Sequence, residues 1–336
     1  MIRFALIGAG FIGRVHARNL AAHPDVDFAL VHDSDPTRAA DVAARHGARA
    51  VASLDAIFAS PAIDAVFNAS STHTHADYLE RAAQAGKAIL CEKPIDLDID
   101  RARHAVAAVT AAGVPAMINF NRRFDASHAE LRANVVAGEA GVIELVQMTS
   151  RGPSVPPLDY IKVSGGQMRD QTIHFFDLLR WITGDDPVEV HAMGAALADP
   201  RVGEAGDVDT SVVLLRLRGG ALCQIDSVRR TSYGYDERIE VCGSAGLIES
   251  RRQRFRGVVR YSGDKIIEDG LHAGWFERIE ASYYRALDAF VTAVQSGAAP
   301  APSLDDGLQA QLIAEAATQS LRTGAPVRID MTATSY

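Results

Sequence analysis

Three side chains of this sequence, Lys93, Asp170 and His174, are of types that move protons and stabilise developing charge. Asp170 and His174 are four positions apart, so on a helix they share one face. Lys93 follows a short apolar run and precedes Pro94, which restricts it to an extended backbone. Loss of hydride from an alcohol carbon needs a base near neutral pKa for the hydroxyl proton and a cation beside the alkoxide. We interpret His174 as that base, Lys93 as the cation, and Asp170 as the group that orients the imidazole.

Simpler interpretations exist for Lys93 and for Asp170. A lysine at the end of a strand is commonly a solvated charge. An aspartate in the first turn of a helix commonly caps that helix or interacts with its dipole. The catalytic interpretation therefore requires a hydride acceptor, and the sequence contains a candidate site for one.

Gly8, Gly10 and Gly13 have the spacing of a dinucleotide-binding turn between a predicted strand and a predicted helix. The next predicted strand ends at Asp33, where a carboxylate would accept hydrogen bonds from the adenosine ribose and repel a 2′-phosphate. We therefore expect NAD in preference to NADP. A glycine-rich turn without a ligand remains an alternative, as does a capping role for Asp33 on a helix near Pro36. Further cofactor-binding candidates, from this turn and from the ends of later strands, are Phe11, Ile12, Ser70, Thr72, His73, Glu92 and Lys93.

The first 120 residues alternate short apolar runs with Ala-rich segments of helical period. Such alternation predicts a parallel sheet covered by helices on both faces, which is the doubly wound Rossmann architecture. The predicted strands lie near residues 4–7, 28–32, 65–69, 88–91 and 116–119. We expect 1–120 to be an NAD-binding domain.

After Asn119 the pattern changes to longer alternating stretches. Predicted strands near 142–150, 210–217, 222–229, 238–242 and 257–261 indicate a second α/β domain with a large, mostly antiparallel open sheet. Helices are expected near 127–137, 170–182, 279–295 and 304–322. We assign 121–336 to substrate binding and oligomerisation, with the option that the last helix packs back on the first domain.

Composition excludes several classes of function. The net charge of −8 and the lack of a basic stripe argue against nucleic-acid binding. No apolar run is long enough to cross a membrane. The three cysteines are far apart and no metal-ligand spacing occurs, so neither disulfides nor a metal site is predicted, and a reducing cytoplasm is expected.

Four further segments carry a resemblance: Cys91–Asp98, Asn121–Asp125, Tyr160–Gly166 and Tyr233–Asp236. With the glycine turn and the Asp-x-x-x-His pair, they resemble the Gfo/Idh/MocA oxidoreductase family over essentially the whole chain, and its inositol 2-dehydrogenases in particular. The resemblance implies catalytic roles for Lys93, Asp170 and His174 and oxidation of a ring hydroxyl of an inositol or related polyol or sugar. It also implies a homo-oligomer, dimer or tetramer, formed through the second sheet. Candidate substrate-binding residues are Lys93, Arg122, Arg151, Tyr160, Arg169, Asp170, His174 and Tyr235.

Three positions depart from the pattern of inositol 2-dehydrogenases. Gly152 and Phe175 stand where a carboxylate is usual, and Arg169 adds a guanidinium just before Asp170. One hypothesis is that the substrate differs from myo-inositol, as another isomer, a less hydroxylated ring or a sugar bearing a carboxylate. The alternative is that these three side chains face away from the substrate.

Other functions fit the same motifs less well. A glycoside-cleaving enzyme with transient oxidation would release no net NADH. A non-catalytic NAD sensor would not need a lysine, a histidine and an aspartate together. Reduction of an imine or a biliverdin-like substrate is disfavoured by the matches around Asn121–Asp125 and Tyr160–Gly166. Tyr160, Tyr235 and Trp275 are candidates to pack against a sugar face, whereas Tyr283 and Tyr284 are expected to be structural.

Overall fold

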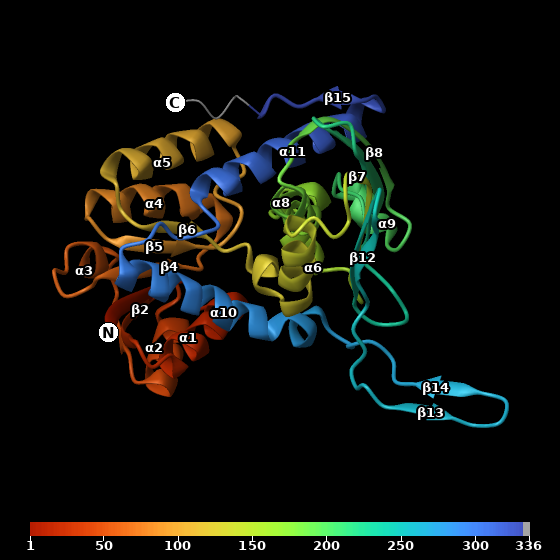
Figure 1. Cartoon of the computed structure of the whole chain (residues 1–336). Helices are drawn as coiled ribbons and strands as arrows, with labels where there is room; N and C mark the ends of the chain where they lie inside the picture. Colours follow the sequence, from red (N-terminus) through yellow and green to blue (C-terminus); the bar gives the residue numbers. More distant parts are fainter. Residues whose placement is uncertain (332–336) are drawn as a thin grey trace. The chain divides into compact units, whose positions relative to one another are not determined.

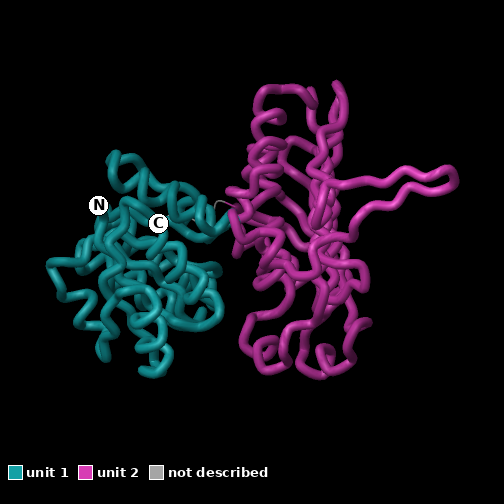
Figure 2. Tube along the Cα trace, turned by 90° about the horizontal axis from the view of Figure 1, so that it is seen from below, with its two compact units in different colours: residues 1–121, 282–309, 334–336 teal, residues 122–281, 310–333 magenta. Residues whose placement is uncertain are grey.

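The computed structural model describes residues 1–331, which form two compact units (Figures 1 and 2). Unit 1 contains Met1–Asn121 and Ser282–Gln309. Unit 2 contains Arg122–Ala281 and, of the described residues, 310–331. The chain therefore leaves the first unit after Asn121 and returns to it at Ser282, ahead of the last helix.

Among the described residues, unit 1 contains a six-stranded, all-parallel sheet in the order β3-β2-β1-β4-β5-β6. Its inner strands are buried on both faces, which explains their continuous apolar sequence. The strand order reverses direction between β1 and β4, so the carboxyl ends of these strands form a binding crevice. The strands are β1 (Ile2–Ile7), β2 (Val26–His32), β3 (Arg49–Ala50), β4 (Ala65–Asn68), β5 (Ala88–Cys91) and β6 (Ala116–Ile118).

Crossover helices connect these strands, and local sequence fixes where several of them begin and end. Asp35 and Asp98 cap α2 and α5 by accepting hydrogen bonds from backbone N–H groups of the first turn. Gly47 and Gly113 end the same two helices in left-handed conformation. The helices are α1 (Phe11–Ala22), α2 (Pro36–His46), α3 (Asp55–Phe58), α4 (His75–Gln84) and α5 (Ile99–Ala112).

Over the described part of unit 2, a seven-stranded sheet has the order β12-β11-β7-β10-β9-β8-β15. Only β7 and β10 pair in parallel, and the other neighbours are antiparallel. The predicted fold class of both halves is confirmed. The strands are β7 (Ile143–Arg151), β8 (Pro187–Ala195), β9 (Thr210–Leu217), β10 (Leu222–Val228), β11 (Asp236–Gly243), β12 (Gly246–Ser250) and β15 (Val327–Arg328).

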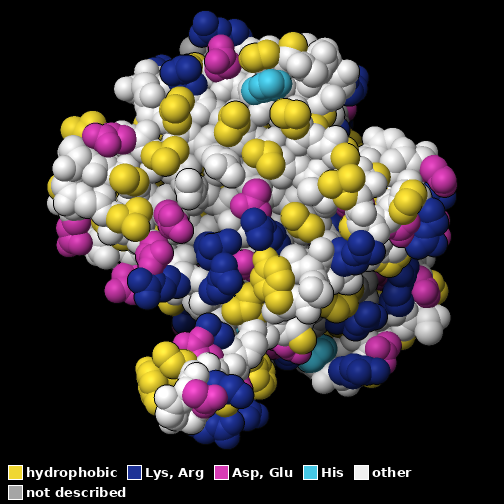
Figure 3. Space-filling view, turned by 90° about the vertical axis from the view of Figure 1, so that its right-hand side faces the viewer, with side chains coloured by type: hydrophobic (Ala, Val, Ile, Leu, Met, Phe, Trp, Pro, Cys, Tyr) yellow, Lys and Arg dark blue, Asp and Glu magenta, His cyan; other side chains and the backbone are white. Residues whose placement is uncertain are grey.

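One face of the unit 2 sheet is covered by helices (Figure 1). This face forms the core of the unit, with Phe175, Phe176 and Leu179 among its buried side chains. The opposite face is open, and hydrophobic side chains lie on it among charged ones (Figure 3). Exposed members are Leu145, Val212, Leu214, Leu222 and Leu247. The shorter helices of this unit are α6 (Ala126–Val136), α7 (Leu158–Ile161), α8 (Ile173–Thr183) and α9 (Pro200–Glu204).

Some elements differ from the sequence expectations. The helix expected from Asp170 begins as a π-helical turn, Met168–Thr172, and continues as α8. The segment near 257–261 is not part of the main sheet, because β13 (Val259–Tyr261) pairs only with β14 (Ile266–Glu268) in a hairpin that projects from unit 2 (Figures 1 and 2). The two long helices, α10 (Trp275–Ser296) and α11 (Leu304–Thr323), each run from one unit into the other. None of the described helices has the length and apolarity of a membrane span.

Candidate active site

The glycine turn of unit 1 lies between β1 and α1, where each glycine has a distinct steric reason. A Cβ on Gly8, whose φ is +96°, would lie 2.3 Å from the carbonyl oxygen of Ala69. A Cβ on Gly13 would lie 2.1 Å from the carbonyl oxygen of Gly8. Gly10, by contrast, has no atom within 4 Å of the equivalent position. Gly8 and Gly13 thus permit close backbone packing, while Gly10 leaves open space at the N-terminus of α1, where a pyrophosphate fits.

Asp33, directly after β2, is held against this turn. Its Oδ2 accepts a hydrogen bond from the Ala9 N–H at 2.7 Å, and its Oδ1 accepts one from the Asp35 N–H at 2.8 Å. Burial opposes ionisation of Asp33, but the two backbone N–H groups and Arg38 at 3.0 Å outweigh it and hold its pKa below the ordinary value. The cap of α2 is Asp35, so the alternative that Asp33 caps this helix is wrong.

The loops after β4 and β5 carry the other cofactor candidates of unit 1. Half-buried Ser70 hydrogen-bonds Asn68 and Thr74, while Thr72 and the exposed His73 lie in a short 3₁₀ turn. Phe11 and Ile12 form the first turn of α1, and Phe11 is exposed.

Glu92 is buried directly before Lys93, and its carboxylate is engaged inside unit 1. Oε1 lies 2.7 Å from both His16 Nε2 and Asn119 Nδ2. Burial opposes ionisation, but these two partners outweigh it, and the pKa of Glu92 is lowered. Glu92 therefore anchors the end of β5 and supports the backbone of half-buried Lys93, whose N–H lies 3.3 Å from Oε2.

His75, which sequence reasoning missed, connects the two loops. Its ring nitrogens lie 2.7 Å from the Pro94 carbonyl and 3.1 Å from the Ser70 carbonyl. Burial lowers its pKa despite these contacts. A single buried ring therefore fixes the loop after Lys93 against the loop that starts at Ser70.

In unit 2, Asp170 lies in the π-helical turn and His174 in the first turn of α8. Asp170 Oδ1 accepts a hydrogen bond from the hydroxyl of Tyr160 at 2.7 Å. Its Oδ2 lies 3.4 Å from Nη1 of Arg229, a side chain that is only 2% exposed. A π-helical turn inside a helix is a feature often found at functional sites. The structure thus brings two predicted residues, Asp170 and Tyr160, into direct contact, next to a buried arginine that was not predicted.

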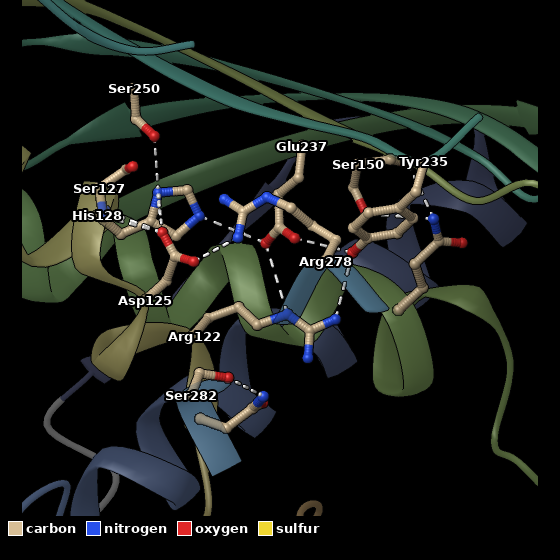
Figure 4. Close-up of polar contacts among 12 residues, drawn as sticks. Arg122, Asp125, Ser127, His128, Ser150, Tyr235, Glu237, Ser250, Arg278 and Ser282 are labelled. Carbon is tan, nitrogen blue, oxygen red and sulfur yellow. Dashed lines mark hydrogen bonds and ion pairs between the residues drawn. The ribbon is translucent and has the colours of Figure 1, made fainter. Parts of the chain in front are cut away.

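Two other predicted substrate-binding residues, Arg122 and Tyr235, meet in a buried cluster (Figure 4). The Tyr235 hydroxyl donates to Glu237 at 2.8 Å and accepts from Arg122 at 3.2 Å. Burial opposes ionisation of Glu237, but Arg122, His128 and Arg278 outweigh it and hold its pKa well below the ordinary value. Burial and Glu237 raise the pKa of Tyr235. The cluster is therefore a charged interior of unit 2, in which Arg122 and Tyr235 already have protein partners.

The remaining candidates of unit 2 also have defined partners. Arg151 pairs with Asp226 at 2.5 Å, and Arg169 forms a two-pronged ion pair with Glu315 of α11, 2.5 Å at each contact. The charge that Arg169 adds is therefore already compensated by a carboxylate of the same unit. Trp275 is half-buried at the start of α10, with Phe276 beside it.

The other two departures differ in their surroundings. Phe175 is 1% exposed and belongs to the core of unit 2. Gly152 lies beside the end of β10, and a Cβ there would meet its nearest atoms at ordinary contact distance, 3.8 Å. Phe175 thus acts in packing, while position 152 has room for a larger side chain.

Two family models match separate parts of the chain. Residues 2–120 match the oxidoreductase family with an NAD-binding Rossmann fold, and residues 128–249 match the GFO/IDH/MocA C-terminal domain. The chain is 43% identical to inositol 2-dehydrogenase of Rhizobium meliloti over 95% of this chain and 97% of that protein. The chain belongs to the Gfo/Idh/MocA oxidoreductase family.

Other members of the Gfo/Idh/MocA family match over nearly the full length. Myo-inositol 2-dehydrogenase of Thermotoga maritima is 39% identical, with 98% of this chain and 99% of that protein covered. The crystal structure of scyllo-inositol dehydrogenase from Lactobacillus casei, with bound NAD(H) and scyllo-inositol, superimposes with a TM-score of 0.91 at 26% identity, covering 98% of this chain and 99% of that one. This chain is an NAD-dependent dehydrogenase, as its Rossmann domain and glycine turn indicate.

Within this Gfo/Idh/MocA member, the residues that sequence reasoning missed are mostly partners of predicted ones. Arg229 directly follows β10 as observed and was the last residue of the strand predicted there, and Glu237 lies two positions after Tyr235. Glu315 lies 146 positions from Arg169. None of the three had a local signal, because even Glu237 lies between the charged Asp236 and Arg238 at the start of β11.

Proposed function

We propose that this enzyme oxidises a secondary ring hydroxyl of an inositol to the ketone, with NAD as hydride acceptor. The observation that carries the proposal is the Asp170 carboxylate, which accepts a hydrogen bond from Tyr160 at 2.7 Å one helical turn before His174. The full-length similarity to inositol dehydrogenases of three species supports the substrate class.

In this proposal each side chain has one role. His174 accepts the hydroxyl proton, and Asp170 stabilises the imidazolium that forms. Lys93 stabilises the developing alkoxide. Gly8, Gly10, Gly13 and Asp33 hold the dinucleotide, with the ribose hydroxyls on Asp33, and the bound cofactor supplies the hydride acceptor.

The contacts of the three departing positions bear on the choice of substrate. Arg169 is neutralised by Glu315, and Phe175 lies in the core, so neither offers a new charge to a ligand. We therefore infer that the substrate is an inositol and not a sugar acid. Gly152 remains the position at which isomer preference is expected to differ.

A panel of substrates tests this proposal. NADH absorbance is measured with myo-, scyllo- and chiro-inositol, glucose and glucuronate, each with NAD and with NADP. We expect the highest kcat/KM with an inositol and NAD, and stoichiometric NADH release. A preference for glucuronate would show the substrate class to be wrong.

We also propose that the enzyme is a homo-oligomer, a dimer or tetramer, formed through the open face of the unit 2 sheet. Exposed Leu214 and Val212 on β9 support this, because an apolar patch on a sheet face is typical of an interface. Light scattering of wild type and Leu214→Glu tests it, and a monomeric wild type would contradict it.

The three cysteines are free thiols, which supports a reducing cytoplasm as the location.

A further inference from the structure

Arg229 is a buried cation that the proposed roles leave unexplained. Its guanidinium lies between two carboxylates, with Nη1 3.4 Å from Asp170 Oδ2 and Nη2 3.4 Å from Asp207 Oδ2. Arg229 is 2% exposed, and the side chains of Asp170 and Asp207 are 15% and 9% exposed. In such a poorly solvated place, a cation shared by two anions has a large effect on both of them.

All three groups are fixed by separate contacts. The Arg229 N–H donates to the Asp209 carbonyl at 2.8 Å, which anchors the arginine at the end of β10. Asp207 Oδ1 accepts a hydrogen bond from the Gln167 N–H at 2.9 Å, directly before the π-helical turn. Asp207 and Arg229 therefore approach the turn of Asp170 from two other segments of unit 2.

We infer that Arg229 is a positioning residue for Asp170 and that Asp207 holds the other nitrogen of the same guanidinium. The inference rests on the proposed function, because Asp170 matters for turnover only if it supports His174. Tyr160 holds one oxygen of Asp170 and Arg229 holds the other, so the carboxylate has a single orientation. Without the guanidinium, Asp170 and Asp207 repel each other, and Asp170 turns away from its place.

The shape of the guanidinium suits this role. Its planar fork reaches two carboxylates with different nitrogens, whereas a lysine ammonium is a single point charge. Arg229→Lys keeps the charge and loses the two-sided geometry. It is therefore expected to retain more activity than Arg229→Gln and less than wild type.

Kinetics of a charge-balanced series test the inference. The series is Arg229→Gln, Arg229→Lys, Asp207→Asn, the double variant Arg229→Gln/Asp207→Asn, and the control Arg230→Gln at the exposed neighbour. Arg229→Gln is expected to lower kcat on the best inositol about 100-fold, which is typical when a reacting group is misplaced by about 1 Å, with unchanged affinity for NAD. The double variant is expected to recover about tenfold of that loss, because one anion leaves with the cation. The control is expected to match wild type.

The possible outcomes separate this inference from the proposed function. A wild type without activity on any inositol would contradict the proposed function. A wild type that is active while Arg229→Gln keeps its kcat and only unfolds at a lower temperature would show that Arg229 is merely structural. A crystal structure of Arg229→Gln gives a readout without substrate. We expect the Asp170 carboxylate to have left the Tyr160 hydroxyl, and an unmoved carboxylate would overturn the inference.

Discussion

The candidate sites of the two units are built in different ways. In unit 1 the candidate cofactor site consists mainly of backbone, with glycines that allow close packing and with N–H groups that hold Asp33. In unit 2 the site consists of side-chain charges, where Asp170 depends on Tyr160 and Arg229. Backbone sites follow from short local motifs, whereas charged sites depend on partners that come together only in the fold. We therefore expect substitutions at the glycine turn and Asp33 in unit 1 to change mainly cofactor binding, and substitutions of charged residues in unit 2 to change turnover or stability.

The largest effect is expected from the two proposed proton-transfer and charge-stabilising groups. His174→Ala and Lys93→Ala should each lower kcat by about 10²- to 10⁴-fold, since each removes an interaction needed in the transition state. NAD affinity, measured by quenching of intrinsic fluorescence, should stay within about twofold of wild type because the glycine turn and Asp33 are intact.

The Lys93 variant also distinguishes a role in turnover from a role in cofactor binding, because Lys93 lies in unit 1 beside the cofactor candidates. Should Lys93→Ala weaken NAD binding and leave kcat unchanged at saturating NAD, Lys93 would be a cofactor ligand. The matched control is Lys87→Ala, whose ammonium binds the Ser60 and Ile63 carbonyls and has no proposed role in turnover. That variant should lose stability and keep kcat.

The second-largest effect is expected on the stability of unit 2. Glu237→Gln removes a buried anion from Arg122, His128 and Arg278, and breaking such a buried pair costs about 3–5 kcal/mol of unfolding free energy at neutral pH. Urea unfolding, followed by tryptophan fluorescence, measures it. The control is Glu249→Gln, at a half-buried glutamate whose partner Arg251 is exposed, and it should change the unfolding free energy by at most about 1 kcal/mol.

The same substitution changes the pH dependence of stability. The folded-state pKa of Glu237 is lowered, so its contribution is complete above the ordinary glutamate pKa and declines as the pH falls toward the folded value. Unfolding free energy of wild type should therefore decline in acid below about pH 4.3, the ordinary value. Glu237→Gln should show a shallower decline there. Parallel curves for the two proteins would mean that Glu237 does not carry this dependence.

The difference between the units also explains what the sequence could predict. The strands of unit 1 and its glycine turn follow from apolar runs and spacing, and Gly8, Gly10 and Gly13 have the local surroundings that this spacing requires. The short edge strand β3 was missed, because Arg49 and Ala50 carry no apolar pattern.

In unit 2 the helical period predicted that Asp170 and His174 share a helix, but not the π-helical turn that contains Asp170. Nor did spacing reveal that Arg169 faces Glu315, or that Arg122 and Tyr235 share Glu237. Partners of a buried charge are set by tertiary packing, which a local pattern does not contain. The chemistry-bearing residues were therefore predictable, and their electrostatic support was not.

A smaller effect should separate the two kinds of glycine in unit 1. Gly10→Ala meets no protein atom, so its unfolding free energy should stay within about 0.5 kcal/mol of wild type. Its NAD affinity should fall at least about tenfold, because the methyl group occupies the space into which the pyrophosphate fits. Gly13→Ala is the matched variant, in which the new Cβ would overlap the Gly8 carbonyl and destabilise unit 1 by about 1–3 kcal/mol. Equal losses of stability in both variants would contradict the assignment of Gly10 to ligand approach.

The smallest effect is expected at Asp33, where selectivity and not turnover should change. Asp33→Asn keeps the side-chain size but removes the charge that accepts the ribose hydroxyls and neutralises Arg38 at 3.0 Å. NAD affinity should fall about fivefold to tenfold, since hydrogen bonds to a charged group contribute about 1.5–3 kcal/mol and the amide oxygen retains part of this. NADP affinity should rise, because the Asp33 charge that repels the 2′-phosphate is gone and Arg38 keeps only the longer contact with Asp35, at 3.4 Å. The ratio of kcat/KM for the two cofactors measures this change, with kcat at saturating NAD as the internal control. A ratio that stays at its wild-type value would mean that the ribose does not contact Asp33, and the backbone contacts of the glycine turn would then carry cofactor binding alone.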